Sequence, residues 1–374
     1  MTMRQTPPFR ADQVGSLLRP ARLADARAKA AKGEITAESL GGTDDGSLRA
    51  VENECIREAV AAQERAGLHA VTDGEFRRGS WVMDFFLGLD GIEEKELSDV
   101  PAFSSGFRPT SMATTGKIGN PTGVTVEDFK FLKSVATKTA KQCIPSPSLA
   151  YHRGGRAMID KGIYPEIEDY WRDLWSAYKN EVKLLADAGC SYLQLDDTTF
   201  AMICDPKVRQ SFVDRGDDPD AMLATYARGI NEVAAARPDG MAITVHMCRG
   251  NFQSSWIAEG GYEPVAELLF SEVNVDGFFM EWDSERSGGF EPLRFVRDDQ
   301  IVVLGLITSK TPELEDKDLI KRRLDEAAKY VPLERLCLSP QCGFASTHQG
   351  NKLSEDEQWR KLEWVVEIAD EVWG

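Results

Sequence analysis

Four residues in the second half of the chain have side chains that suit a metal ion. They are His246, Cys248, Glu281 and Cys342, and each falls at or just beyond the end of a predicted strand. His246 and Cys248 are two residues apart, so in a strand both side chains point to the same face. An imidazole, two thiolates and a carboxylate suit Zn²⁺ in tetrahedral geometry. His-x-Cys alone is a weak signal, but with Glu281 and Cys342 at equivalent strand ends it favours a zinc site.

Other polar residues follow predicted strands: Ser16, Asp73, Glu75, Asp196 and Asp197. We interpret Glu75 and Asp196 as substrate-binding carboxylates that could hold the ammonium group of an amino acid. Asp73 is better explained by a salt-bridged loop, and Asp197 by a turn that its side chain caps. The remaining cysteines are predicted to be small core residues: Cys55, Cys143, Cys190, Cys204 and Cys337.

Strands alternate with helices along most of the chain, and this alternation positions the reactive residues. The predicted strands span 12–16, 70–74, 140–145, 191–197, 242–248, 277–282, 301–308 and 335–340. The predicted helices span 47–66, 166–188, 219–236, 263–271, 291–297, 315–330 and 355–372, and a further helix begins at Pro20. Such alternation indicates βαβ crossovers and a parallel sheet.

Eight strands of this kind predict an α/β fold, the (β/α)8 TIM barrel, in which reactive residues gather at the C-terminal strand ends. An open doubly wound sheet is the alternative. It is disfavoured because no Gly-x-Gly-x-x-Gly follows the first strand. Residues from about 95 to 140 break the rhythm and are predicted to be an insertion after the second strand. We therefore expect residues 1–374 to form a single catalytic barrel domain with this one excursion.

Composition and charge argue against several classes of protein. The net charge is −17, and this argues against nucleic acid or an anionic membrane as a partner. No apolar run approaches the roughly 18 residues of a membrane helix, and the N-terminus does not resemble a signal peptide. Seven irregularly spaced cysteines do not resemble a disulfide framework, so a reducing cytoplasm is expected. A homo-oligomer is compatible with the sequence.

Six segments resemble the cobalamin-independent methionine synthase family, specifically its short, single-barrel members related to the catalytic C-terminal half of the long enzyme. They keep the family's order over nearly the whole chain: Gln13–Ser16, Val71–Arg78, Gln194–Asp196, His246–Asn251, Phe279–Glu281 and Leu338–Phe344.

The resemblance implies a TIM barrel with zinc held by His246, Cys248, Glu281 and Cys342. It also implies that Ser16, Glu75 and Asp196 contact the amino acid. In the family reaction, the sulfur of homocysteine binds zinc and takes a methyl group from 5-methyltetrahydrofolate without cobalamin. A metal-bound thiol is deprotonated, and the thiolate is the nucleophile.

The half of the site that would bind the methyl donor departs from the family pattern. The long enzyme has a second, N-terminal barrel that helps to hold polyglutamated folate, and no counterpart is expected among these 374 residues. The loop after the seventh strand resembles Asp-x-His-Ser in the long enzyme but is Thr308–Thr311 here. The loop after the third strand, where the family has a Trp against the pterin, is Pro145–Tyr151 here. Lys310 or His348 is the candidate general acid that would protonate the leaving group of the donor.

Two alternatives stay open. The same site could alkylate coenzyme M or another thiol, or use another methyl carrier. A sulfonate acceptor calls for basic contacts, whereas Glu75 and Asp196 suit an ammonium group. The barrel could instead be a non-catalytic zinc-binding or thiol-sensing protein, although purely structural zinc sites seldom include a carboxylate.

Overall fold

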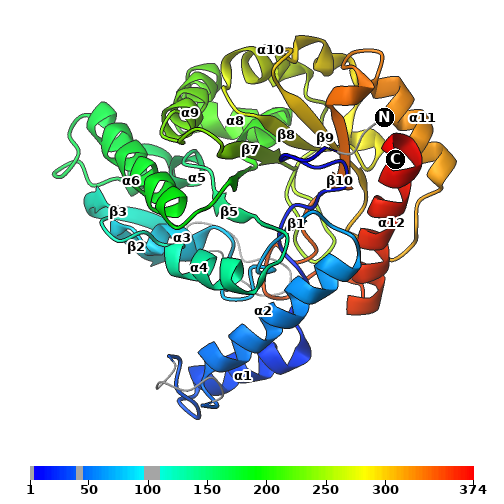
Figure 1. The fold of residues 1–374 in the computed structure, drawn as a ribbon. Coiled ribbons are helices and arrows are strands. Elements are labelled where there is room, and N and C mark those ends of the chain that lie inside the picture. The colour runs from blue at the N-terminus through cyan, green and yellow to red at the C-terminus, as the bar shows by residue number, and fades with distance from the viewer. Residues whose placement is uncertain (1–3, 39–44, 97–109) are drawn as a thin grey trace.

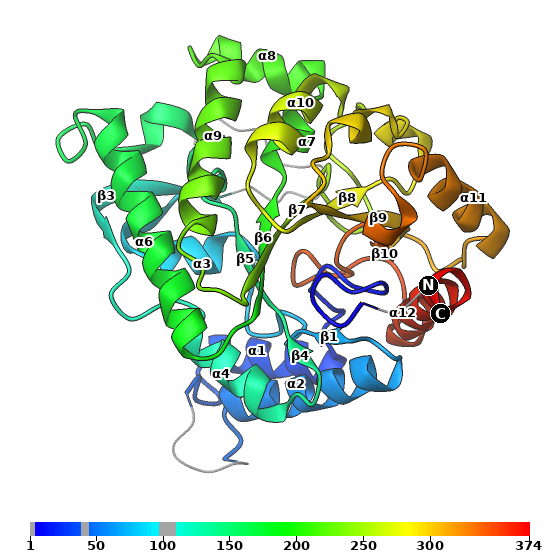
Figure 2. The ribbon, with the colours of Figure 1, turned by 45° about the horizontal axis from the view of Figure 1, so that its top comes forward.

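The computed structural model describes residues 4–38, 45–96 and 110–374. Its centre is a six-stranded parallel sheet in the order β10-β9-β8-β7-β6-β5. The strands are β5 (Gln142–Pro145), β6 (Tyr192–Asp197), β7 (Ala242–Met247), β8 (Gly277–Glu281), β9 (Ile301–Ile307) and β10 (Leu336–Pro340). In Figure 2 these strands lie at the centre with helices around them. The strands are buried along their length, as expected for a parallel sheet covered by helices.

The chain closes this sheet with two further parallel segments. β1 (Ala70–Val71) pairs with β4 (Thr139–Ala140), which runs directly into β5. At the other edge, Ala11 forms a parallel bridge with Leu338 of β10. The segment that contains Ala11 meets the β1 segment through the hydroxyl of Thr72, which donates to the carbonyl of Gly15 at 2.6 Å. The predicted α/β fold with a parallel sheet is confirmed, and its segments follow the predicted order around a TIM-like barrel. The first predicted strand, 12–16, is not a strand, because its segment contacts the sheet through the single bridge at Ala11.

Helices cover the outside of the barrel, and most lie where the sequence predicts them. They are α2 (Leu48–Arg65), α4 (Val126–Val135), α6 (Ile167–Asp187), α9 (Pro219–Ala234), α10 (Glu263–Glu272), α11 (Lys317–Ala327) and α12 (Glu355–Trp373). α1 (Ala21–Ala31) packs on α2, and both extend from one end of the molecule in Figure 1. The predicted helix 291–297 is instead a 3-10 helix, η3 (Glu291–Phe295).

Short helices fill several of the loops. They are α3 (Met83–Leu87), α5 (Leu149–His152), α7 (Thr199–Ile203), α8 (Pro206–Asp214), η1 (Gly155–Met158), η2 (Glu285–Ser287) and η4 (Leu333–Arg335). Among the described residues, no helix combines the length and the apolar composition that a membrane crossing requires.

The break in the barrel rhythm corresponds to an antiparallel hairpin. β2 (Asp90–Glu96) pairs with β3 (Thr110–Gly119), and β3 packs against α6. The excursion predicted at 95–140 thus begins a few residues early, at β2. It returns to the barrel by α4, which packs against α2 and α6. Residues 97–109 of that prediction lie outside the described residues. The assignment of the whole chain to a single domain stays a prediction.

A buried ion pair ties the first strand segment to its neighbours at the N-terminal end of the barrel. Lys141 Nζ lies 3.2 Å from Asp12 Oδ1 and also donates to the carbonyl of Gln13 at 2.5 Å. The hydroxyl of Tyr192 donates to Asp12 Oδ2 at 2.8 Å, and the backbone amide of Phe9 donates to the same oxygen at 3.1 Å. The side chains of Asp12 and Lys141 are fully buried. We call Asp12, Lys141 and Tyr192 the basal triad.

Candidate active site

Three of the four predicted metal ligands meet at the C-terminal end of the barrel. One nitrogen of His246 and the sulfurs of Cys248 and Cys342 all lie within 4.8 Å of one another. The two sulfurs are 3.7 Å apart. His246 is in β7, Cys248 follows β7 directly, and Cys342 lies two residues beyond β10. Residues far apart in the sequence are brought together here because parallel strands end at the same edge of a barrel.

The donor atoms of this metal group (His246, Cys248, Cys342) are suited to a soft or borderline cation. All three residues are buried, and neither ring nitrogen of His246 has a hydrogen-bond partner. Burying an imidazole whose nitrogens have no hydrogen-bond partner costs free energy unless a ligand or metal ion binds those nitrogens. The neighbouring thiol of Cys248 and the imidazole of His246 lower the pKa of Cys342 well below its usual range. The residues present therefore fit Zn²⁺, which prefers thiolate and imidazole ligands.

Glu281 ends β8 at the same rim, but its carboxylate lies outside the tight metal group and makes contacts with cations. Its Oε1 pairs with Arg286 and lies 3.4 Å from Lys310 Nζ. Its Oε2 accepts a hydrogen bond from the backbone amide of Arg249 at 2.7 Å. Lys310 also lies 3.2 Å from Asp283 Oδ2. Ligating carboxylates are commonly held by such hydrogen bonds, so these contacts are compatible with Glu281 as a ligand.

A second buried group lies beside the first. Ligand atoms of Glu75, Cys143 and Asp196 lie within 4.8 Å of one another. Burial raises the pKa of Glu75, and burial together with the nearby Glu75 raises the pKa of Asp196 to about 7. Glu75 Oε2 has no hydrogen-bond partner, and Arg78 Nη1 is 3.7 Å from it. We call Glu75 and Asp196 the carboxylate pair.

The backbone around the carboxylate pair is tightly constrained. Glu75 itself has a φ of 58°, a conformation that a residue with a side chain rarely adopts and that is common at functional sites. Gly15 has a φ of 139°, and a Cβ there would lie 2.7 Å from Cys143 Sγ and 3.3 Å from Glu75 Oε1. Only glycine fits at position 15, and its missing side chain leaves room for Cys143 and Glu75.

The metal group and the carboxylate pair are linked by the paired strands β6 and β7. Asp196 of β6 and His246 of β7 are direct register partners in the parallel sheet. A molecule held by the carboxylate pair therefore lies next to the metal group. This adjacency allows one small ligand to reach both groups.

The other predicted residues have clear positions. Ser16 is buried, and Gly343 packs so closely on it that a Cβ at 343 would lie 1.9 Å from Ser16 Oγ. Ser16 thus lies beside the Cys342 loop. His348 is exposed on the same loop. Asp73 Oδ1 accepts the backbone amide of Glu75 at 2.8 Å.

Asp197 is taken up by local hydrogen bonds, as expected for a residue that caps a turn. Its Oδ1 accepts from the amide and the hydroxyl of Thr199, both at 2.6 Å, and its Oδ2 accepts from Ser148 at 2.5 Å.

Cys143 is the site residue that sequence reasoning missed. It was predicted to be a core residue and is indeed buried, but its sulfur faces the carboxylate pair. Cys143 lies two residues before the end of β5, and the sequence rule considered only strand ends and the loops beyond them. The other core cysteines are buried as predicted: Cys55, Cys190, Cys204 and Cys337.

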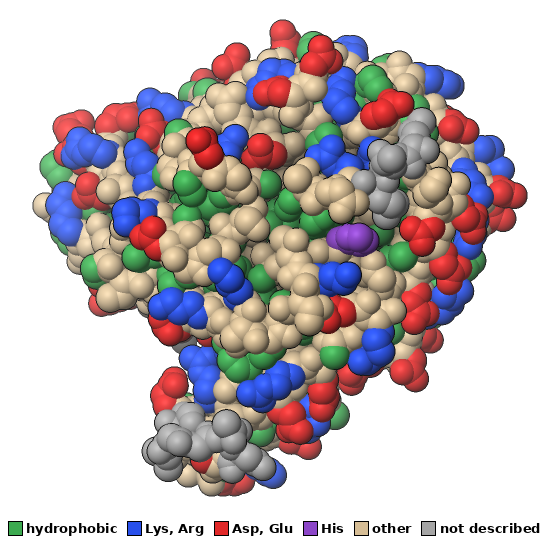
Figure 3. Space-filling view, viewed as in Figure 1, with side chains coloured by type: hydrophobic (Ala, Val, Ile, Leu, Met, Phe, Trp, Pro, Cys, Tyr) green, Lys and Arg blue, Asp and Glu red, His purple; other side chains and the backbone are tan. Residues whose placement is uncertain are grey.

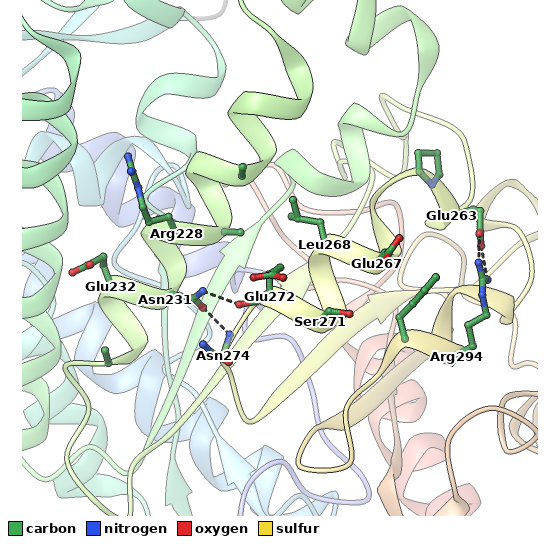
Figure 4. A pocket seen from close by; sticks show the side chains of 15 residues that line it. Arg228, Asn231, Glu232, Glu263, Glu267, Leu268, Ser271, Glu272, Asn274 and Arg294 are labelled. Carbon is green, nitrogen blue, oxygen red and sulfur yellow. Dashed lines mark hydrogen bonds and ion pairs between the residues drawn. The ribbon is translucent and has the colours of Figure 1, made fainter.

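The outer surface has features of a different kind. On the face shown in Figure 3, acidic and basic side chains alternate around the margin, with hydrophobic side chains nearer the centre. A groove between α9 and α10 is lined by ion-paired and amide side chains, including Glu263 with Arg294 and Asn231 (Figure 4). None of the predicted site residues lines this groove.

Comparison with known proteins identifies the family of this chain. The family model for the cobalamin-independent synthase catalytic domain matches residues 11–371. The Bacillus subtilis (strain 168) protein YxjH is 48% identical over 98% of this chain and 95% of its own length. The crystal structure of a putative vitamin-B12 independent methionine synthase from Listeria monocytogenes is 42% identical, with a TM-score of 0.78, and the match covers 99% of this chain and 100% of that one.

A more distant relative is the 5-methyltetrahydropteroyltriglutamate–homocysteine methyltransferase of Cronobacter sakazakii (strain ATCC BAA-894). It is 26% identical over 81% of this chain, but the match covers 37% of the relative's length. The match of the family model over nearly the whole chain shows that this protein belongs to the cobalamin-independent methionine synthase family of methyltransferases.

Proposed function

We propose that the protein is a zinc-dependent methyltransferase that converts homocysteine to methionine without cobalamin. We propose 5-methyltetrahydrofolate, as a mono- or polyglutamate, as the methyl donor. The observation that carries the proposal is the adjacency of the metal group and the carboxylate pair through Asp196 and His246. An amino acid with a terminal thiol has the two functional groups that such a site would recognise. We expect the reaction to take place in the cytoplasm.

In this proposal, zinc would be held by His246, Cys248, Cys342 and Glu281, and it would keep the substrate sulfur in its reactive thiolate form. Glu281 is oriented for this role by Arg249, Arg286 and Lys310. The zinc assignment is supported by the two close sulfurs and by the unpartnered ring nitrogens of His246.

The carboxylate pair and Ser16 would bind the amino-acid end of the substrate. An ammonium group between Glu75 and Asp196 favours the ionised form of both carboxylates, so it offsets the cost of their burial. Such contacts hold the substrate in one orientation and bring its sulfur toward the metal group. Holding the sulfur in this orientation lowers the activation barrier of methyl transfer, because less translational and rotational freedom is lost on the way to the transition state.

The methyl donor requires protonation of its leaving nitrogen, and Lys310 and His348 are the proposed candidates. Lys310 is buried beside Glu281, whereas His348 is exposed on the loop that follows Cys342. Single replacement of each residue by Met or Gln, respectively, tests the assignment. Replacement of the residue that protonates the donor should lower kcat. Zinc content is measured in parallel for the Lys310 variant, because Lys310 also contacts Glu281.

Other thiols remain testable acceptors. A sulfonate such as that of coenzyme M would meet Glu75 and Asp196, and the like charges disfavour it. The direct experiment uses zinc-loaded protein with radiolabelled methyl donors and either homocysteine or coenzyme M. We expect labelled methionine and no labelled methyl-coenzyme M. If neither homocysteine nor another thiol alters the absorption spectrum of the cobalt-substituted protein, the site does not activate thiols and the proposal fails.

A further inference from the structure

The two thiols of the metal group are not held together by neighbouring strands. Cys248 follows β7 and Cys342 follows β10, and β8 and β9 lie between these two strands in the sheet. The sequence separation of the two cysteines is 94 residues. The sheet therefore defines only the approximate positions of the two sulfurs. Contacts between the loops at the rim must set the final distance.

A network of buried polar side chains makes these contacts. Asn251, three residues after Cys248, donates to the carbonyl of Gly343 at 2.9 Å. The hydroxyl of Ser309, in the loop after β9, donates to the same carbonyl at 3.1 Å. Gly343 directly follows Cys342, so both bonds act on the backbone next to the thiol. Gln341, on the other side of Cys342, donates to the Ser309 hydroxyl at 2.9 Å.

Asn351 is the centre of this network because it contacts all three loops. Its side-chain amide donates to the carbonyl of Ser309 at 2.7 Å, and its side-chain oxygen accepts from the amide of Ser254 at 3.1 Å. Its backbone amide donates to the carbonyl of Phe344 at 2.9 Å. Ser254 belongs to the loop after β7 and has a φ of 68°. Asn351 thus holds a loop in an uncommon conformation and is itself buried.

We infer that Asn351, with Ser309, is a positioning residue that sets the separation of Cys248 and Cys342 for metal binding. The inference rests on the proposed zinc-dependent function. Neither residue belongs to the metal group. Ser309 holds the backbone beside Cys342 through the carbonyl of Gly343, and the side chain of Asn351 ties Ser309 to Ser254 in the loop after Cys248. Hydrogen bonds that orient metal ligands typically change metal affinity by about 10- to 100-fold when they are removed.

The test compares Asn351→Ala with a matched control, Asn231→Ala. Asn231 also joins two segments with two side-chain hydrogen bonds, to the carbonyl of Glu272 and from the amide of Asn274, both at 2.7 Å, but on the outside of the barrel (Figure 4). Zinc affinity is measured in the full chain by competition with a chromophoric chelator. The absorption bands of the cobalt-substituted protein report the coordination geometry.

We expect Asn351→Ala to lower zinc affinity by about 10- to 100-fold and to change the cobalt bands. Asn231→Ala should leave both unchanged, even where thermal stability falls equally. Ser309→Ala is a milder variant that keeps the fold if Asn351→Ala does not, and it should lower affinity by about 3- to 10-fold.

Unchanged zinc affinity and cobalt bands in Asn351→Ala, or in Ser309→Ala where only that variant folds, would overturn the inference. A wild-type chain that binds neither metal would overturn it as well. If the wild type binds zinc and the variants weaken binding, but homocysteine is not methylated by any donor, the inference stands and the proposed function fails.

Discussion

The barrel interior has two polar regions that are equally buried but differently satisfied. In the basal triad, Asp12 accepts hydrogen bonds from Lys141, from Tyr192 and from backbone amides. At the opposite end, both ring nitrogens of His246 and one oxygen of Glu75 have no hydrogen-bond partner. Buried polar groups are normally hydrogen-bonded, and at the rim the groups that are not lie where the proposed metal and substrate would bind.

Structural and functional charges in this barrel differ in whether the protein alone satisfies them. The basal triad joins three strand segments and is complete without any ligand. The carboxylate pair sets two acids together under burial, which raises the pKa of Asp196 to about 7. Structural charges should therefore stabilise the free protein, whereas the rim charges should destabilise it until a substrate binds. The following four expectations test this contrast.

Removal of one member of the basal triad should have the largest effect. Lys141→Met leaves Asp12 ionised and buried without its cation, and breaking a buried pair in this way costs about 3–5 kcal/mol. The free energy of unfolding from urea titration measures the loss. The double variant Asp12→Asn with Lys141→Met should recover part of it. A loss below about 1 kcal/mol in the single variant would show that the triad is not a structural pair.

Replacement of a rim thiol should affect metal and activity more than stability. Cys342→Ser should remove zinc and lower turnover of homocysteine by at least about 100-fold, or about 2.7 kcal/mol, because a ligand is lost. Zinc content by mass spectrometry and methionine formation are the measurements. Cys337→Ser is the control, because Cys337 is a fully buried cysteine of the same β10 segment outside the metal group. Full zinc content in Cys342→Ser would contradict the ligand assignment.

Neutralisation of Asp196 should stabilise the protein while it impairs substrate binding. The raised pKa means that the folded form binds the proton more tightly than the unfolded form, so this carboxyl lowers stability as the pH rises from about 4 to 7. Asp196→Asn should therefore increase the free energy of unfolding at pH 8 by about 1–3 kcal/mol. The gain should shrink below pH 7 and vanish near pH 4. A destabilised variant at pH 8 would place Asp196 with the structural charges.

The smallest expected effect is the pH dependence of substrate binding in the wild type. An ammonium group favours the ionised carboxylates, so its binding releases protons from groups whose pKa burial has raised. The value of kcat/KM for homocysteine should fall as the pH drops below about 7, by roughly tenfold per pH unit, which is about 1.4 kcal/mol. Steady-state kinetics between pH 5.5 and 8.5 measure it. The Asp196→Asn variant should show a flatter profile.

The order of the strands and the residues at their ends were predictable because each depends on local sequence pattern. Apolar strands separated by amphipathic helices indicate a parallel sheet, and the common edge at which its strands end brings His246, Cys248 and Cys342 together. Features that depend on tertiary packing could not be predicted in this way. The contacts of Glu281 with Arg286 and Lys310 depend on how two loops fold over the rim.

Cys143 faces the carboxylate pair from within its strand rather than from the strand end. The network around Asn351 joins three loops, and loop closure is decided by tertiary packing rather than by any local repeat. The pairing of β2 with β3 also depends on tertiary packing, so the sequence predicts only a break in the alternation of strands and helices there.

The close packing at Gly15 has a consequence for how this site can change during evolution. A methyl group at position 15 would collide with Cys143, and the backbone conformation at Gly15 opposes any side chain. Position 15 is therefore closed to single substitutions, while a smaller residue at 143 would free space beside the carboxylate pair. Changes in this part of the site should arise first through position 143, and the effect of any later change at 15 should depend on which residue 143 then carries. The evolution of the two positions is thus coupled by epistasis.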